Sequence, residues 1–245
     1  IAPSLSCIDI LVALYYKVMN IPEDSSHKDW QERDRFILSK AHGCYGLYAI
    51  LADIGFLHKE DWKNFYNGSF LPGCVERNEK HGIEASCGSL GHGLPLAVGV
   101  AFGAKLQNKN YNTYCIAGDG EMQEGSMWEA SQFAVKHNLS NLTLIIDNNK
   151  LQAMDFLENV LTPKGAENDL GKKLEVFGFE VKTCNGHDIE EIVKTLNSWK
   201  CKDKPKALIA NTIKGFGLKC MENIPKFHFR LPTNEELQMG NRYDQ

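Results

Sequence analysis

The sequence lacks the features of several large classes of protein. No apolar run approaches the ~18–20 residues that a membrane-spanning helix needs. The net charge is only −4, so the chain as a whole has no general attraction for nucleic acid or an anionic membrane. There is no internal repeat and no low-complexity tract. We therefore expect neither a membrane protein nor a nucleic-acid-binding protein.

Paired cysteines are also absent. None of the eight cysteines forms a CxxC motif, and they are scattered through a chain too large to need disulfides for its stability. This pattern predicts reduced thiols in a cytoplasmic protein and argues against a structural zinc site. The cysteines are Cys7, Cys44, Cys74, Cys87, Cys115, Cys184, Cys201 and Cys220.

The chain has enough apolar residues for a sizeable core, 43% of 245. Four short apolar runs are typical of buried parallel strands, and helical patterns separate them. We predict strands at 113–117, 142–146, 179–184 and 207–212, and helices at 125–137, 165–177 and 187–199. Alternation of this kind predicts an α/β fold with a doubly wound, mostly parallel sheet flanked by helices. With no obvious linker, we expect one domain spanning 1–245.

The first hundred residues show a less regular pattern. Apolar spacing predicts a helix within 6–19, with Ser6 as its cap. A short strand at about Phe36 and a helix over 43–54 should follow, whereas 60–85 should be irregular. Small residues dominate 88–106, and a helix so rich in glycine is tolerable only where a backbone or a ligand must come very close.

The stretch from Gly118 to Leu151 is the most informative. Gly118, Asp119 and Gly120 follow one predicted strand, and Asn149 follows the next. The carboxyl ends of parallel strands meet at one edge of the sheet, where open α/β sheets bind ligands. A carboxylate and an amide oxygen beside a glycine turn suit a hard divalent cation that phosphate oxygens also hold, which is how Mg²⁺ usually binds.

Four segments of the sequence together resemble the thiamine-diphosphate-binding domain of the transketolase family. They are GDGEMQEG with DNNKL, ASCGSLGHGLP at 85–95, SKAHG around His42, and TIKGFG at 212–217. The resemblance implies that Asp119, the Asn149 side chain and the Leu151 main-chain carbonyl bind Mg²⁺, or Ca²⁺ or Mn²⁺ in its place. It also implies cofactor contacts at Gly88 and Leu90 for the aminopyrimidine ring, and at Gly118 and Gly120 for the diphosphate.

The same resemblance implies roles for several other side chains. His42 and His228 match family positions near the thiazolium ring, where neutral imidazoles can pass protons to and from sugar hydroxyls. Glu124 resembles a glutamate of the subunit-to-subunit network near the cofactor, or is a solvated carboxylate in the first turn of a helix. Lys214 either approaches the diphosphate or is solvated. His92 either caps its turn or faces the cofactor.

The sequence departs from the family's pattern in two places. The family has a glycine–histidine pair just before the segment that begins here at Ile1, so we expect a preceding segment that ends in a catalytic histidine. Cys74 stands where transketolases place a histidine that touches the hydroxymethyl end of the donor sugar. Either His81 takes over this catalytic position, or the donor is handled differently.

The resemblance covers only the first domain of a transketolase. It implies a split enzyme whose second subunit carries the pyrimidine-binding and C-terminal domains, with two copies of each subunit in a heterotetramer. This enzyme would move a two-carbon ketol unit between sugars or sugar phosphates. Alternatives are a subunit of a deoxyxylulose-phosphate-type synthase, the alpha subunit of a 2-oxo-acid dehydrogenase, and a non-catalytic module that binds thiamine diphosphate.

Overall fold

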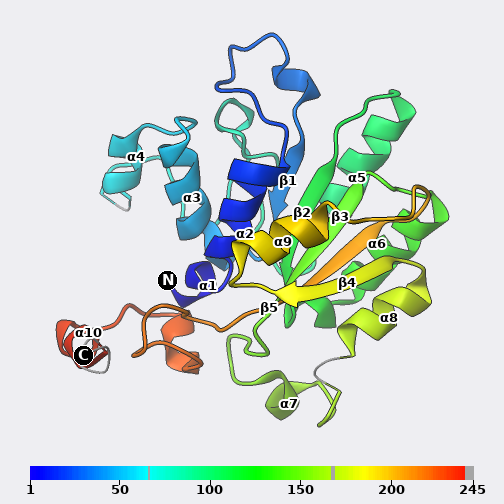
Figure 1. Cartoon of the computed structure of the whole chain (residues 1–245). Helices are drawn as coiled ribbons and strands as arrows, with labels where there is room; N and C mark the ends of the chain where they lie inside the picture. Colours follow the sequence, from blue (N-terminus) through cyan, green and yellow to red (C-terminus); the bar gives the residue numbers. More distant parts are fainter. Residues whose placement is uncertain (66, 167–168, 241–245) are drawn as a thin grey trace.

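The computed structural model describes residues 1–65, 67–166 and 169–240 and contains one five-stranded sheet (Figure 1). Its strands are β1 (Arg35–Leu38), β2 (Thr113–Gly118), β3 (Leu142–Asn148), β4 (Glu180–Asn185) and β5 (Lys206–Asn211). They lie in the order β1-β2-β3-β5-β4, and every neighbouring pair is parallel. The predicted parallel sheet is confirmed, with strand ends within two residues of those expected.

The order of the last two strands explains why helices cover both faces. The chain passes from β3 to the edge strand β4, then turns back to insert β5 between them. Because parallel crossovers are right-handed, connections that run in opposite directions place their helices on opposite faces. The helix before β4, α8 (Leu170–Phe177), therefore lies on one face, and the helix before β5, α9 (Ile189–Leu196), lies on the other.

Each face is completed by helices from earlier in the chain. On the face of α8, α5 (Gly93–Leu106) packs against β1 and β2, and α6 (Gly125–Lys136) packs between α5 and α8. On the opposite face, α2 (Ile8–Ala13) packs against α9 and α3 (Cys44–Asp53). Figure 1 shows α2 and α9 in front of the sheet, and α5 and α6 behind it.

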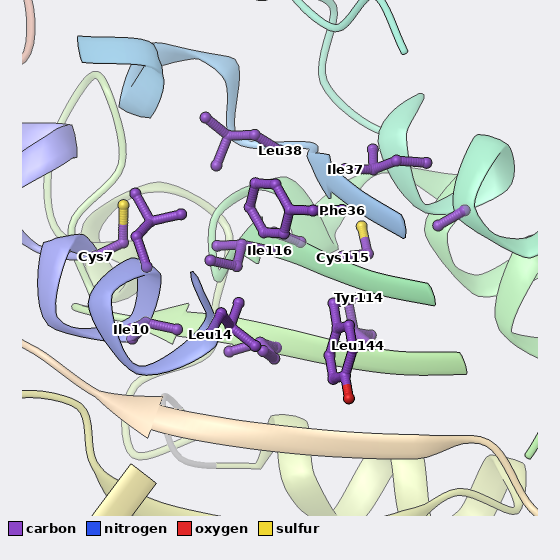
Figure 2. Packing of buried hydrophobic residues seen from close by; sticks show 14 of the residues in the cluster. Cys7, Ile10, Leu14, Phe36, Ile37, Leu38, Tyr114, Cys115, Ile116 and Leu144 are labelled. Atoms are coloured by element: carbon purple, nitrogen blue, oxygen red, sulfur yellow. The ribbon is translucent and has the colours of Figure 1, made fainter. Parts of the chain in front are cut away.

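The core lies between these layers. Every residue of β3 is buried, as expected of a central strand that is covered on both faces. Figure 2 shows side chains of β1 and β2, among them Phe36 and Ile116, directed toward Ile10 and Leu14 from the N-terminal helical segment, whereas Cys115 points away from them toward Ile37. Burial of each large apolar side chain contributes roughly 1.5–3 kcal/mol to the stability of the fold. The packing between the sheet and the N-terminal helical segment therefore holds the ends of β1 and β2 in place.

Several local predictions need correction. Ser6 does not cap the first helix, because Cys7 is the N-cap residue and the Ser6 hydroxyl donates to Oδ2 of Asp147 at 2.6 Å. The helix expected at 165–177 begins at Leu170, and residues 167–168 lie outside the described residues. The region expected to be irregular contains a short helix, α4 (Lys59–Lys63). The helix predicted within 6–19 ends as a π-helix, Leu14–Val18. Elements without a sequence prediction include α1 (Ala2–Leu5), α7 (Leu157–Val160) and α10 (Asn234–Gly240).

Within the described ranges, no helix combines the length and the apolar character that crossing a bilayer requires.

Candidate active site

The turns that follow β1, β2, β3 and β5 meet at the carboxyl edge of the sheet. They surround a cavity with an empty volume of ≈ 570 Å³. Residues that the sequence singled out and that line it are His42, Leu90, Gly118, Asp119, Gly120, Asn149, Leu151, Lys214 and His228. Lys40, Glu121 and Gln152, which sequence reasoning did not single out, line it as well. Pairing of Gly118 with Asp147 across β2 and β3 places the two predicted metal-binding turns side by side.

Asp119 and Asn149 are both buried at this edge. The Asp119 carboxylate accepts hydrogen bonds from the backbone N–H groups of Gly120, at 2.7 Å, and Lys150. The amide oxygen of Asn149 accepts the N–H of Leu151 at 3.0 Å. Burial, and then the nearby charge of Asp147, raises the pKa of Asp119 to about 6. Burial therefore makes the negative charge of Asp119 costly, and a cation bound beside it would offset that cost.

Asp147 organises the polar interior below the cavity, a role that sequence reasoning missed. Its carboxylate is fully buried and accepts hydrogen bonds from Ser6, Lys40, Asn149 and Thr212. Burial opposes ionisation, but the Lys40 ammonium and these donors hold the pKa of Asp147 below its usual range. A carboxylate inside the otherwise apolar run LTLIID was the signal available in the sequence.

Glu121 joins the two glycine turns and was also missed. It is 3% exposed. Its carboxylate accepts hydrogen bonds from the Ser39 hydroxyl at 2.6 Å, the Gly91 N–H at 2.9 Å and the Gly118 N–H at 3.3 Å. Burial raises the pKa of Glu121, while these donors act in the opposite direction. The turn containing Leu90 is thereby fixed against the turn that begins at Gly118.

His42, His228 and Lys214 form a continuous line of polar groups along the cavity wall. The Nζ of Lys214 lies 2.7 Å from Nδ1 of His228, whose Nε2 lies 3.2 Å from Nδ1 of His42. An ammonium can only donate, so Nδ1 of His228 accepts and its Nε2 carries the proton that it donates to His42. The remaining nitrogen of His42, Nε2, then carries its own proton.

Both imidazoles are neutral at physiological pH. Burial, followed by the nearby positive charge of Lys214, lowers the pKa of His228 to about 3. Burial, followed by the charge of Lys214, also lowers the pKa of His42. Neutral imidazoles can both give and take a proton, which is the property that the predicted relay requires.

Lys214 is a buried cation, 2% exposed. Its amine donates to the carbonyls of Leu151, at 2.8 Å, and Gln152, at 3.3 Å. No carboxylate of the described chain lies within 4.0 Å of it. Burial, and then the charge of Lys40, lowers the pKa of Lys214 to about 8. The cavity therefore holds a positive charge that an anionic ligand would stabilise.

A second, more open cavity adjoins the first and shares His42 and His228 with it. Its other lining residues include Tyr45, Cys74 and Arg230. Gly88 lies beside Cys74, since a Cβ added to Gly88 would be 3.7 Å from the Cβ of Cys74. Cys74 thus lines the same cavity as His42 and His228.

His81 does not reach either cavity, which corrects the expectation that it replaces the missing histidine. Its Nδ1 lies 2.5 Å from the carbonyl of Phe56, and its ring stacks on Phe70. Glu124 lies outside the cavity lining, as the exposed N-cap residue of α6 beside Gly91. His92 is the N-cap residue of α5, with Nδ1 3.3 Å from the carbonyl of Ser89.

These residues fit a diphosphate held together with a divalent cation. Asp119, Asn149 and the Leu151 carbonyl supply oxygen atoms of the kind that Mg²⁺ prefers. The buried Nε2 of Gln152 has no partner within the described chain, so it is a donor available to a ligand. A side chain at Gly120 would meet Gln152, at 2.8 Å from Cβ to Cβ, so this turn is closed to residues larger than glycine.

Comparisons with known proteins identify the family of the chain. Residues 2–239 match the family described as "Transketolase, thiamine diphosphate binding domain". The chain is 42% identical to one subunit of the apulose-4-phosphate transketolase of Actinobacillus succinogenes, covering 96% of this chain and 84% of that protein. It is 36% identical to SqwG, a subunit of the 6-deoxy-6-sulfo-D-fructose transketolase of a Clostridium species, covering 95% and 83%.

A solved structure supports the same fold. The transketolase of Campylobacter jejuni superposes on 98% of this chain with a TM-score of 0.82 and 32% sequence identity. The match takes up only 38% of the Campylobacter chain. The present chain thus matches one part of a longer transketolase and most of the length of the proteins named as subunits.

Proposed function

The chain belongs to the transketolase family, and we propose that it is the thiamine-diphosphate-binding subunit of a split enzyme. This enzyme transfers a two-carbon ketol unit from a ketose to an aldose. The observation that carries the proposal is the cavity itself, in which oxygen ligands on one side face a line of two neutral histidines and a buried lysine. The whole chain acts as one diphosphate-binding domain.

Asp119, Asn149 and the carbonyl of Leu151 would hold Mg²⁺, with Ca²⁺ or Mn²⁺ able to replace it. The turn of Gly118 and Gly120 would contact the diphosphate. Lys214 would balance its charge, because this buried ammonium has carbonyl and imidazole partners instead of a carboxylate. When bound, thiamine diphosphate supplies the electron sink that permits cleavage of a bond next to a carbonyl.

The part of this chain in the reaction is to hold and move protons. His42 would donate its Nε2 proton to a sugar oxygen in the second cavity while its Nδ1 takes the Nε2 proton of His228. Nδ1 of His228 would in turn take a proton from the Lys214 ammonium, which becomes a neutral amine. Lys214 keeps His228 in the tautomer that makes this transfer possible, since its amine donates to Nδ1 of His228. Gly88 and Leu90 would contact the aminopyrimidine ring, and Glu124 would contribute to the network at the partner surface.

A partner subunit is expected to cover the rim of the cavity. Large apolar side chains are exposed there, which is typical of an interaction surface. They are Leu90 at 45%, Phe229 at 74% and Leu231 at 63%. We propose that this partner carries the pyrimidine-binding and C-terminal domains and that the assembly holds two copies of each subunit. The relatives that are named as subunits support a second chain.

The substrates are proposed to be sugars or sugar phosphates, because the names of two related enzymes specify a sugar phosphate and a sulfo-sugar. Eight free cysteines support a reducing, cytoplasmic location, and those at 7, 44, 87, 115 and 184 are buried. Cys74 beside His42 supports a site that handles the donor without a histidine at that position.

A label-transfer experiment tests the activity. The chain, assembled with its second subunit, is incubated with a ketose labelled with ¹³C at its first two carbons and an unlabelled aldose. We expect the labelled pair to appear together in a new ketose, only with thiamine diphosphate and Mg²⁺. Decarboxylation of pyruvate without a ketose would instead indicate a synthase or a dehydrogenase. Cofactor binding without any turnover would indicate a non-catalytic module.

A further inference from the structure

The side chain of His187 joins two turns and a helix outside the cavity. His187 follows β4, and its Nδ1 lies 2.9 Å from Oδ2 of Asp9 in the first turn of α2. Its Nε2 accepts a hydrogen bond of 2.8 Å from the backbone N–H of Ile213, in the turn after β5. The imidazole also stacks on Phe216 in the same turn, with ring centroids 3.7 Å apart.

These contacts determine the tautomer of His187. A backbone N–H can only donate, so Nε2 must present a lone pair to Ile213. The proton is therefore on Nδ1, where it is donated to the Asp9 carboxylate. Asp9 thus orients the ring and fixes its tautomer, in the way that carboxylates orient histidines bound to metals.

The same turn carries Lys214, the residue directly after Ile213. The backbone after Lys214 is tightly constrained. Gly215 has a φ of +84°, and a Cβ there would lie 2.7 Å from the carbonyl oxygen of Met221. The Lys214 carbonyl accepts the N–H of Asn223 at 2.9 Å. The bond from Ile213 to His187 fixes the turn on the side where the chain enters it.

The turn after β4, which carries His187, is also held rigidly. The N–H of Gly186 donates to the carbonyl of Asn211 at 2.7 Å. A Cβ at Gly186 would lie only 2.3 Å from Cγ2 of Thr212, so the two turns approach as closely as glycine allows. Asp188 caps α9 by accepting the N–H of Glu191 at 3.0 Å. His187 therefore projects from a rigid turn.

We infer that His187, oriented by Asp9, is a positioning residue that holds the turn of Lys214 so that its amine reaches His228 and the Leu151 carbonyl. His187 lies outside the cavity lining and acts through Lys214. The effect on cofactor binding rests on the proposed function, but the effect on the contact between Lys214 and His228 does not.

Variants of His187 test this inference with two measurements. In the assembled enzyme, calorimetry should show that His187→Ala raises the Kd of thiamine diphosphate in the presence of Mg²⁺ by about tenfold, as for other residues that orient ligands. His187→Gln should restore most of the affinity, because its amide oxygen can accept the Ile213 N–H. In the cofactor-free chain, the ¹⁵N shift of Nδ1 of His228 should change in His187→Ala as the contact with Lys214 is lost.

His137→Ala is the matched control. His137 packs against the rings of Phe102 and Phe133 at the carboxyl end of α6 and lines neither cavity. Its loss should lower thermal stability and leave both the Kd and the His228 shift unchanged. The inference is overturned if His187→Ala changes neither quantity. Failure of the unaltered enzyme to bind the cofactor would count against the proposed function alone, and the His228 shift would still decide the inference.

Discussion

Nε2 of His228 lies 3.2 Å from Nδ1 of His42, although the two residues are 186 positions apart in the chain. His42 belongs to the turn after β1, and His228 ends the short helix Pro225–His228 near the last part of the chain. Their rings meet edge to face with centroids 4.8 Å apart. The relay that we propose depends on this contact.

Removal of either histidine should affect turnover more than binding. We expect His228→Ala to lower kcat by roughly 10²–10⁴-fold, the usual contribution of general acid–base catalysis, while the cofactor Kd changes little. His42→Ala should behave similarly. Because the two act in one relay, the double variant should lose little more than either single variant. Steady-state kinetics and calorimetry check this, and a loss confined to affinity would make His228 an anchor.

The lowered pKa of His228 should make folding stability depend on pH. In the unfolded chain a histidine binds a proton as the pH falls through 6.5, whereas folded His228 stays neutral until about pH 3. Below pH 6.5 the unfolded state therefore binds more protons, and the unfolding free energy falls as the pH decreases. Urea unfolding of the chain from pH 7 to 5 should show a shallower decline in His228→Gln. Identical slopes would contradict the assignment.

Asp119 should be essential for cofactor binding and unfavourable for folding. Its carboxylate is buried beside Asp147, and its pKa is raised to about 6. We expect Asp119→Ala to abolish Mg²⁺-dependent binding of thiamine diphosphate. In the absence of Mg²⁺ and cofactor, its melting temperature should equal or exceed that of the unaltered chain. Adding both should raise the melting temperature only of the unaltered chain, and unchanged cofactor affinity in the variant would refute the metal site.

The pair of Lys40 and Asp147 should be costly to break. Both side chains are buried, and removal of one partner leaves an uncompensated charge. Lys40→Met should lower the unfolding free energy by about 3–5 kcal/mol. The exposed pair of Lys63 and Glu60 provides the control, since Lys63→Met should cost less than ~1 kcal/mol. Similar losses in the two variants, measured by chemical denaturation, would count against the organising role of Asp147.

Two glycines should respond in opposite ways to replacement by alanine. Gly91 has a φ of +81°, and a Cβ there would lie 2.4 Å from Oγ of Ser126. Gly91→Ala should therefore destabilise the chain and weaken cofactor binding through the adjacent Leu90. Gly99, inside α5, has nothing within 4 Å of an added Cβ, so Gly99→Ala should stabilise the isolated chain by up to ~1 kcal/mol. Thermal unfolding of both variants separates backbone strain from helix propensity.

The sequence was sufficient for the parts of the molecule that follow from local pattern. Strand–helix alternation predicted the parallel sheet, and the spacing between Asp119 and Asn149 placed both at one edge because parallel strands end together. Lys40 and Asp147 escaped notice because their partners come from segments far apart, with 107 positions between the two charges. Their pairing depends on the packing of β1 and β3 around β2, which local pattern does not specify.

Two other errors have the same origin. Ser6 precedes a helix and has the side chain of a cap, but the buried carboxylate of Asp147 takes its hydroxyl. His81 lies near Cys74 in the sequence, but the carbonyl of Phe56 and the ring of Phe70 hold it outside the cavities. Asp147 is 141 positions from Ser6, and Phe56 is 25 positions from His81, so neither contact follows from the pattern around the residue itself.

The most direct test of the account is isolation of this chain from extract of its own cells, followed by an assay for ketose cleavage that depends on thiamine diphosphate. We predict that a second chain is isolated with it in equal amount and that the complex cleaves a ketose, whereas neither chain does so by itself. The opposite result would contradict the split enzyme. In that case the chain would be isolated alone and bind the cofactor, and it would cleave no ketose even when the rest of the extract is added back.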